Sequence, residues 1–231
     1  MAIITISKEF GCAGDYVAER VAEKLNYKII NKEIIEYVSI LTDTDREIVK
    51  SYDEERHSNF KATLSKYVDF SIFKDVFSLK DEELKYCRLK LDDDEGLFQE
   101  NIKQDLSFDS EKYQNTVEKI IHKLAQKDNV VIVGRGGQFI LKGYANAIHI
   151  RLYADKKSKI KWVSHREKID EKTAEQKIQE IEKKRYNYIM HYYNEDVTDL
   201  NHYHLAINLS KSDIDEVSRM IVAIVKDRFA V

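Results

Sequence analysis

The chain contains no proline, only two cysteines and only seven glycines in 231 residues. Without proline, the usual composition of a linker is missing, and glycine becomes the main residue that interrupts regular structure. Cys12 and Cys87 are too few for a disulfide framework or a four-cysteine zinc site, and they suit a reducing compartment. Five of the seven glycines lie in two short segments, 11–14 and 134–137, which are therefore the candidate functional turns.

Long apolar segments and a large net charge are also lacking. No apolar run approaches the roughly 20 residues that a membrane helix needs, and the N-terminus has no basic segment of the kind that begins a signal peptide. The net charge is -3, with acids and bases mixed along the chain, so no long-range field would attract DNA or RNA. We therefore expect a cytoplasmic globular protein that binds neither membranes nor nucleic acids. The sequence leaves its oligomeric state open.

Short β-branched runs alternate with amphipathic segments over much of the chain. Ala2–Ser7 (AIITIS) is typical of a strand buried on both faces, and apolar residues between Val17 and Leu25 recur at helical spacing. The same patterns predict strands at 27–30, 130–133, 147–153 and 204–209, helices at 111–124, 155–168 and 172–194, and a last helix capped by Ser212. This alternation predicts an α/β fold with a central parallel sheet covered by helices.

The first glycine-containing turn joins the N-terminal strand to the first helix. At a helix N-terminus, converging backbone N–H groups and the helix dipole favour an anion such as phosphate. The Walker pattern G-x-x-x-x-G-K-[ST] adds a lysine and a hydroxyl. In this chain Ala13 stands at its second glycine, Gly14 at its lysine and Asp15 at its hydroxyl position. On the motif alone, a phosphate-binding turn and an ordinary strand-to-helix turn both remain open.

Cys12 lies within this turn. A cysteine nucleophile of the phosphatase kind would need an arginine close behind it in the same loop, and Arg20 lies well into the helix. Cys12 is therefore interpreted as a small buried thiol.

Five segments of the sequence are informative together: ITISKEFGCAGDYVAERVAEKL, KIINKEII, SYDEE, VVIVGRGGQFIL and YHLAINLS. They resemble the cytidylate kinase-like family, a branch of the P-loop nucleoside monophosphate kinases. The resemblance touches most of the chain except about residues 57–95. Family members commonly have an S-R-E-F-G-S-G-G turn that itself lacks the Walker lysine, so the absence of that lysine here follows the branch.

The resemblance implies a single P-loop NTPase-like domain over residues 1–231, with three αβα layers. Its core would comprise about 1–31, 106–181 and 202–231, with a helical NMP-binding insert at about 32–105 and a short lid at about 182–201. ATP and the Mg²⁺ that accompanies it are the implied cofactors, and small-molecule nucleotides are the implied partners. No dedicated metal site is implied, although Asp15 or Glu9 could hold the magnesium through water.

The resemblance also implies which residues form the site. ATP would be bound by Lys8, Phe10, Gly11, Cys12, Ala13, Gly14, Asp15 and Tyr16, and the acceptor by Asn31, Lys32, Arg135 and Gly136. The catalytic cations would be Lys8, Arg135 and Arg185, because phosphoryl transfer needs positive charge around the migrating group. Arg135 matches the arginine that contacts the monophosphate in cytidylate kinases, and the alternative is a structural arginine beneath the sheet edge.

Lys8 takes the place of the arginine in the family's turn. We hypothesise that Lys8 substitutes for the Walker lysine by reaching the phosphates from the other side of the turn, the alternative being a lysine that extends from a strand end. Arg185, beside Lys184, lies where family lids carry an arginine. Arg166 is more typical of a solvated helix face. His191, His202 and His204 have no standard zinc spacing.

Three functions are therefore considered. The first is phosphoryl transfer from ATP to CMP or dCMP, giving ADP and CDP or dCDP. The second is a catalytically weak or inactive nucleotide-binding or sensing protein on the same fold, or a kinase with a different small acceptor. The third, an RNA-binding module, has no support from the charge distribution.

Overall fold

The computed structural model describes residues 2–31, 34, 38, 49, 51–52, 109–127 and 129–230. The chain divides into two compact units, Met1–Asn31 with Ala125–Val231, called here the sheet unit, and Lys32–Leu124. Most of the described part of the second unit is α6 (Ser110–Ala125), where Tyr113 stacks on Tyr52 with ring centroids 6.1 Å apart. Most of the predicted insert lies outside the described residues, and its assignment, like that of the lid, stays a prediction.

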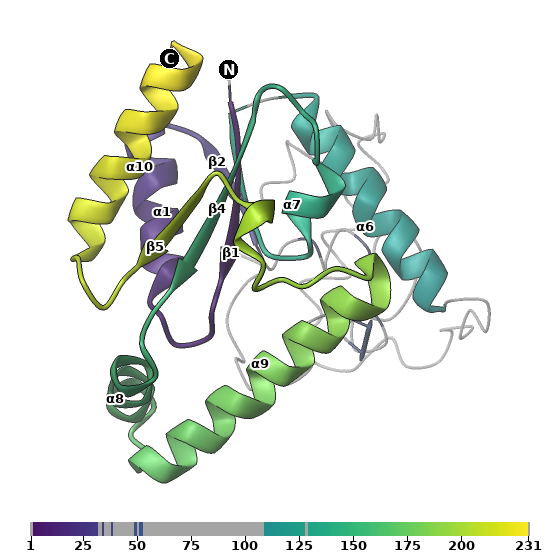
Figure 1. Cartoon of the computed structure of the whole chain (residues 1–231). Coiled ribbons are helices and arrows are strands. Elements are labelled where there is room, and N and C mark those ends of the chain that lie inside the picture. The colour runs from purple at the N-terminus through teal and green to yellow at the C-terminus, as the bar shows by residue number, and fades with distance from the viewer. Residues whose placement is uncertain are drawn as a thin grey trace, which may run out of the picture. The chain divides into compact units, whose positions relative to one another are not determined.

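The sheet unit contains five parallel strands in the order β2-β3-β1-β4-β5 (Figure 1). Their bounds are Ile3–Lys8 (β1), Lys28–Ile30 (β2), Val130–Val133 (β3), Ala147–Tyr153 (β4) and Leu205–Asn208 (β5). Strand β1 is central, because Ile3 pairs with Val130 of β3 on one side and with Ala147 of β4 on the other. The predicted parallel sheet of an α/β fold is confirmed.

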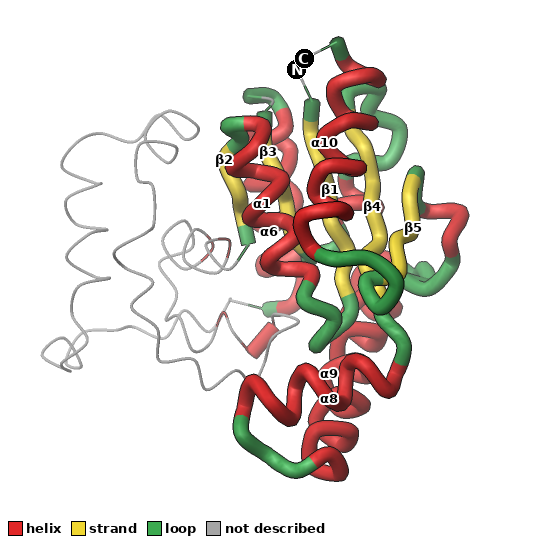
Figure 2. Tube along the Cα trace, turned by 90° about the vertical axis from the view of Figure 1, so that its left-hand side faces the viewer, coloured by secondary structure: helices red, strands yellow, loops and turns green. Residues whose placement is uncertain are grey.

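Helices pack against this sheet and extend beyond it. Their bounds are Gly14–Leu25 (α1), Gly137–Ile140 (α7), Lys156–Glu167 (α8), Glu171–Tyr193 (α9) and Ile214–Phe229 (α10), with a 3₁₀ turn at Leu200–His202. Helices α1 and α10 cover the same face of the sheet (Figure 2). There Ile4 and Ile6 of β1 share one apolar core with Val17 of α1 and Val217 of α10. Burial of these side chains is the main force that holds the layers together.

Aspartate side chains cap three of the helices. Asp155, Asp170 and Asp213 each accept a hydrogen bond from the backbone N–H three residues further on. The prediction that Ser212 caps the last helix was wrong by one position. The first helical residue is Ile214, so the capping position falls to Asp213, whose carboxylate reaches the required amide. The short α7 and the 3₁₀ turn were not predicted at all.

The other face of the sheet is polar at its centre. Thr5 and Ser7 of β1 and His149 and Arg151 of β4 point to this face and are each at most 7% exposed. Thr5 Oγ1 and His149 Nδ1 lie 2.8 Å apart in a hydrogen bond. Helix α7 packs here, since a Cβ placed on Gly137 would lie 3.4 Å from Thr5 Cγ2. A parallel strand buried on both faces is usually apolar, so these buried polar residues depart from the usual composition of such strands.

The buried His149 is expected to make stability depend on pH. Burial, and to a smaller degree the neighbouring His204, lowers the pKa of His149 from 6.5 to about 4. The unfolded chain therefore takes up this proton first as the pH falls below about 6.5, and stability from the neutral ring is lost between about pH 6.5 and 4. Through this group alone, we expect the free energy of unfolding to fall by about 3 kcal/mol over that interval.

His149→Asn keeps a polar atom near Nδ1 for Thr5 but does not titrate. Urea denaturation of both proteins from pH 7 to 4.5 measures the effect, and the variant should lose less stability than the parent over that range. Identical losses would assign the acid sensitivity to other groups.

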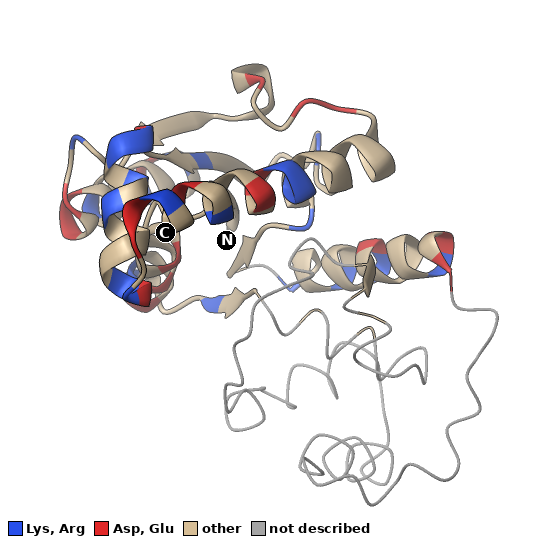
Figure 3. Cartoon of the chain, turned by 90° about the horizontal axis from the view of Figure 1, so that it is seen from below, with Lys and Arg blue, Asp and Glu red and all other residues tan. Residues whose placement is uncertain are grey.

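Charge on the described helices follows the mixed pattern of the sequence. Figure 3 shows acidic and basic residues interspersed over the helices. Within the described part of the chain, none of the helices has both the length and the apolarity to cross a membrane.

Candidate phosphate-binding site

Three residues predicted for the site follow or end neighbouring strands. Asn31 comes directly after β2, Arg135 lies just after β3, and Lys8 is the last residue of β1. Because β2, β3 and β1 are adjacent and parallel, their carboxyl ends meet at one edge of the sheet, where ligands of open α/β sheets bind. Residues from three separate parts of the sequence are thereby brought together.

The turn between β1 and α1 has the backbone conformation that converging amides require. Gly11 and Ala13 both have left-handed φ values, of 79° and 66°. A Cβ on Gly11 would lie 2.6 Å from Val163 Cγ2 of α8, so glycine permits both the positive φ and the close approach of that helix. Ala13, the N-cap of α1, offers no side-chain cap to the helix, which suits an anion there.

The side chain of Lys8 folds across this turn. Its Nζ lies 3.0 Å from Asp15 Oδ2, and the side chain is only 9% exposed. A Cβ on Gly14 would lie 3.0 Å from Lys8 Cβ and 3.3 Å from Lys8 Cδ. The aliphatic stem of Lys8 therefore covers the position that holds the lysine in a Walker turn. The stem is buried and the ammonium reaches the 48% exposed carboxylate of Asp15, so the role of Lys8 as a substitute for the Walker lysine stays a prediction.

A chain of side-chain contacts runs from Lys8 to Arg135. Asp15 contacts Lys8 through Oδ2 and accepts a hydrogen bond through Oδ1 from Asn31 Nδ2 at 3.2 Å. Asn31 Oδ1 in turn accepts from Arg135 Nη1 at 3.2 Å. Two residues predicted to bind ATP are thus connected to two predicted to bind the acceptor, with a cation at each end.

The turn that follows β3 fixes the position of Arg135. The backbone has left-handed φ values of 53° at Arg135 and 68° at Gly136, and the Arg135 side chain is 1% exposed. The Arg135 carbonyl accepts a hydrogen bond from the Tyr193 hydroxyl at 2.8 Å. A left-handed non-glycine residue is unfavourable, so this bond from the end of α9 helps to hold the turn.

Gly136→Ala is expected to destabilise the protein by more than the strain of placing an alanine at a positive φ, because the added Cβ would also collide with Tyr193. A Cβ here would lie 2.2 Å from Tyr193 Cε2, so we expect a loss of about 2 to 4 kcal/mol in the free energy of unfolding. Gly143→Ala is the matched control, because Gly143 has a φ of 85° but no neighbouring atom within 4 Å of its Cβ position. It should cost about 1 kcal/mol. Equal losses in urea denaturation would mean that the Tyr193 contact is not tightly packed.

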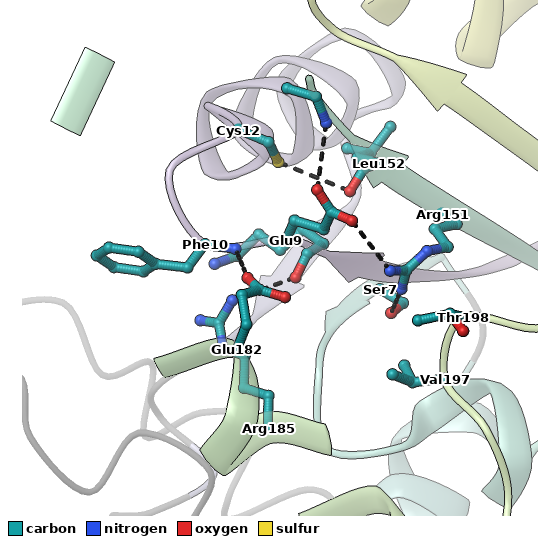
Figure 4. A network of polar contacts seen from close by, with 12 residues as sticks. Ser7, Glu9, Phe10, Cys12, Arg151, Leu152, Glu182, Arg185, Val197 and Thr198 are labelled. Carbon is teal, nitrogen blue, oxygen red and sulfur yellow. Dashed lines mark hydrogen bonds and ion pairs between the residues drawn. The ribbon is translucent and has the colours of Figure 1, made fainter. Parts of the chain in front are cut away.

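The middle of α9 contacts the turn between β1 and α1 directly (Figure 4). Glu182 Oε1 accepts a hydrogen bond from the backbone N–H of Phe10, and Arg185 Nη1 donates to the Lys8 carbonyl at 3.2 Å. The Phe10 ring also lies 5.6 Å from Arg166 Cζ and 5.8 Å from Arg185 Cζ, within range of cation–π attraction. Arg185 therefore lies at the turn, whereas Arg166 is exposed, as expected for a solvated helix face, with its guanidinium beside the Phe10 ring.

The carboxylate of Glu9 is held by residues that the sequence did not single out. Glu9 lies 2.7 Å from Lys159 Nζ and 3.4 Å from Arg151 Nη2, and accepts from the Ala154 N–H at 3.4 Å (Figure 4). These contacts make Glu9 a poor ligand for magnesium and leave Asp15 as the better of the two acids. The position of Arg151 within the mostly apolar run AIHIRLY could have indicated from sequence that it has a specific role. The contact of Glu182 with the turn could not be predicted from sequence, because α9 contains several other acidic residues.

The remaining predicted residues have simpler surroundings. Cys12 is fully buried, its Sγ lies 3.6 Å from the Leu152 carbonyl oxygen, and burial raises the pKa of the thiol. The interpretation as a buried thiol is confirmed, because such a group is a weak nucleophile. Tyr16 is 52% exposed on the first turn of α1. Lys32 lies outside the described residues.

The three late histidines have different partners. His202 Nε2 lies 3.4 Å from Glu195 Oε2, the His204 ring accepts from the His149 backbone, and His191 packs on the ring of Tyr192. Among the residues that the structure describes, no group of three or more histidine, cysteine or acidic side chains could hold a metal ion.

The residues present fit the phosphates of a nucleotide. The Glu182 carboxylate accepts a hydrogen bond from the Phe10 N–H of the turn, as a phosphate oxygen would. The ammonium of Lys8 lies at the same turn. The Asp15 side chain is 48% exposed, and a carboxylate suits a hydrated Mg²⁺. This edge of the sheet can therefore bind a polyanion at the first turn and a second anion near Arg135.

Comparisons with known proteins give the family and the fold. The model of the cytidylate kinase-like family matches residues 3–211. A solved structure of an uncharacterized protein from Eubacterium ventriosum is 24% identical with a TM-score of 0.62, covering 98% of this chain and 99% of that one. YorR from Bacillus subtilis, in complex with phosphorylated GDP, is 16% identical with a TM-score of 0.45, at 97% and 96% coverage. Shikimate kinase from Acinetobacter baumannii, in complex with shikimate, is 12% identical with the same TM-score, at 99% and 95% coverage.

No curated protein matches the sequence significantly. The Eubacterium structure supports the fold alone, because its identity is low and its activity is unknown. The family match is more informative, since it extends from the first strand through both glycine turns to the segment just before α10. The protein belongs to the cytidylate kinase-like family.

Proposed function

We propose that the protein is a nucleoside monophosphate kinase-like phosphotransferase that transfers the γ-phosphoryl group of ATP to CMP or dCMP. The observation that carries this proposal is the chain of contacts from Lys8 through Asp15 and Asn31 to Arg135. A kinase must bring two anionic substrates together, and the presence of a cation at each end of this chain of contacts supports a binding site for each. ATP and CMP are the substrates that the family resemblance favours.

The phosphates of ATP bind at the turn between β1 and α1. The turn amides and the N-terminus of α1 donate hydrogen bonds to the phosphate oxygens, and the ammonium of Lys8 supplies the charge that a Walker lysine supplies elsewhere. For this, Lys8 would leave Asp15, whose carboxylate would then hold, through water, the Mg²⁺ that neutralises charge on the phosphates of ATP. Arg185 adds a second cation from α9.

The acceptor monophosphate binds near the Gly134–Gly137 turn. Arg135 contacts its phosphate, with Asn31 and Gly136 as the neighbouring contacts, and Lys32, which lies outside the described residues, stays a contact implied by the family resemblance. An acceptor phosphate oxygen attacks the γ-phosphorus while the bond from that phosphorus to ADP breaks. Catalysis then consists of positioning the two phosphates and stabilising the charge that spreads over the transferred group.

A second candidate is a nucleotide-binding or sensing protein with weak or no catalysis. The observation that favours it is the composition of the turn, where Gly14 and Asp15 stand at the lysine and hydroxyl positions of the Walker pattern and Lys8 is engaged by Asp15. A kinase with another small acceptor is a variant of the first candidate.

A coupled assay of ADP release against a panel of nucleoside monophosphates separates these candidates. The proposal expects ADP release that depends on CMP or dCMP. ATP binding without turnover on any acceptor would favour the sensing protein. Turnover on a non-nucleotide acceptor would overturn the CMP assignment while keeping the kinase.

A further inference from the structure

Two of the groups that a phosphate would use at the turn are occupied by carboxylates of the chain itself. Asp15 contacts the ammonium of Lys8, and Glu182 accepts the hydrogen bond from the backbone N–H of Phe10. Asp15 is part of the turn. Glu182 comes from the middle of α9, far away in the sequence (Figure 4).

A carboxylate and a phosphate oxygen make the same kind of charge-assisted hydrogen bond with a backbone amide, so they compete for it. We propose that Glu182 occupies a phosphate subsite of the turn in the nucleotide-free protein, and that nucleotide phosphates displace it on binding. This inference rests on the proposed function, because it takes the turn as the site of ATP. It gives Glu182 a role in setting the affinity of that site.

The displacement also has a consequence for Arg185. Residues three apart on a helix share a face, and Arg185 donates to the Lys8 carbonyl next to the amide that Glu182 holds. When Glu182 leaves Phe10, this part of α9 must shift or Glu182 must change rotamer. A shift of α9 would also let the Arg185 guanidinium exchange the Lys8 carbonyl for a phosphate oxygen.

Two substitutions test whether Glu182 competes with phosphate. Glu182→Gln keeps the size and removes the charge, and Glu182→Asp keeps the charge but shortens the reach to Phe10. If Glu182 competes, both variants should bind ATP and inorganic tripolyphosphate about three- to tenfold more tightly than the parent in titration calorimetry. Tripolyphosphate reports on the phosphate subsites without a base. Ligand-induced increases in Tm should be larger for both variants as well.

Glu180→Gln is the matched control. Glu180 lies on the same helix two residues earlier, about 200° around its axis, and forms an exposed ion pair with Lys184. This variant should bind like the parent. If Glu182→Asp also binds like the parent, or if either Glu182 variant binds more weakly, the inference is overturned and Glu182 is a structural clamp or acts through its charge alone. If neither parent nor variants bind ATP, the proposed function itself fails.

Discussion

Lys8→Ala is expected to weaken ATP binding about tenfold or more and to lower kcat/KM for ATP by about two to three orders of magnitude. The stem of Lys8 covers Gly14, which stands at the Walker lysine position, and its ammonium lies 3.0 Å from Asp15. Removing it takes away the cation closest to where the phosphates should bind. Calorimetric titration with ATP and initial-rate kinetics measure the two effects.

Two control variants separate the role of the charge from damage to the fold. Lys8→Arg keeps the charge and introduces the residue that family turns commonly carry, so we expect it to retain activity within about tenfold of the parent. Lys24→Ala removes an exposed lysine from the last turn of α1 and should have no effect. A Lys8→Ala protein that binds ATP as tightly as the parent would refute the idea that Lys8 replaces the Walker lysine.

Arg135→Met is expected to affect the acceptor much more than ATP. Arg135 lies at the far end of the contact chain from Lys8, and methionine keeps much of the buried volume without the charge. We expect kcat/KM for the monophosphate to fall about 10²- to 10³-fold, while the Kd for ATP alone changes less than about threefold. Initial rates at varied acceptor concentration, with ATP saturating, measure this.

Lys142→Met is the matched control for the loss of one positive charge near the same turn. Lys142 is exposed and forms a long ion pair, with 3.8 Å between its Nζ and Glu195 Oε1. Its variant should behave like the parent. If Arg135→Met weakens ATP binding as much as it weakens use of the acceptor, Arg135 would be a structural residue of the sheet edge.

Most of the sheet unit could be predicted because its elements depend on local patterns. The run at Val130–Val133 is wholly β-branched and apolar, the longer one at Ala147–Tyr153 is mostly apolar, and both form the predicted strands. Two elements were missed for local reasons as well. Helix α7 has only four residues, too few for a helical period to show, and the cap of α10 depended on a choice between neighbouring Ser212 and Asp213.

The site was less predictable because its contacts join distant parts of the chain. The glycine turns and the charged Arg135 were visible in sequence, but the path of Lys8 over Gly14 depends on side-chain packing. Glu182 contacts Phe10 because α9 passes beside the turn. The sequence of a helix with many charged residues does not indicate which acid will make this contact. The Glu9 contacts with Arg151 and Lys159 depend on the pairing of β1 with β4 and on the position of α8.

The central claim is that Lys8 and Arg135 bind the phosphates of two substrates on one edge of the sheet. A crystal structure with a non-hydrolysable ATP analogue, Mg²⁺ and CMP tests it most directly. The claim predicts Lys8 Nζ within about 3 Å of a phosphate oxygen of the analogue and Arg135 in contact with the phosphate of CMP. A structure in which the bound analogue leaves Lys8 paired with Asp15, or in which CMP lies away from Arg135, would contradict it.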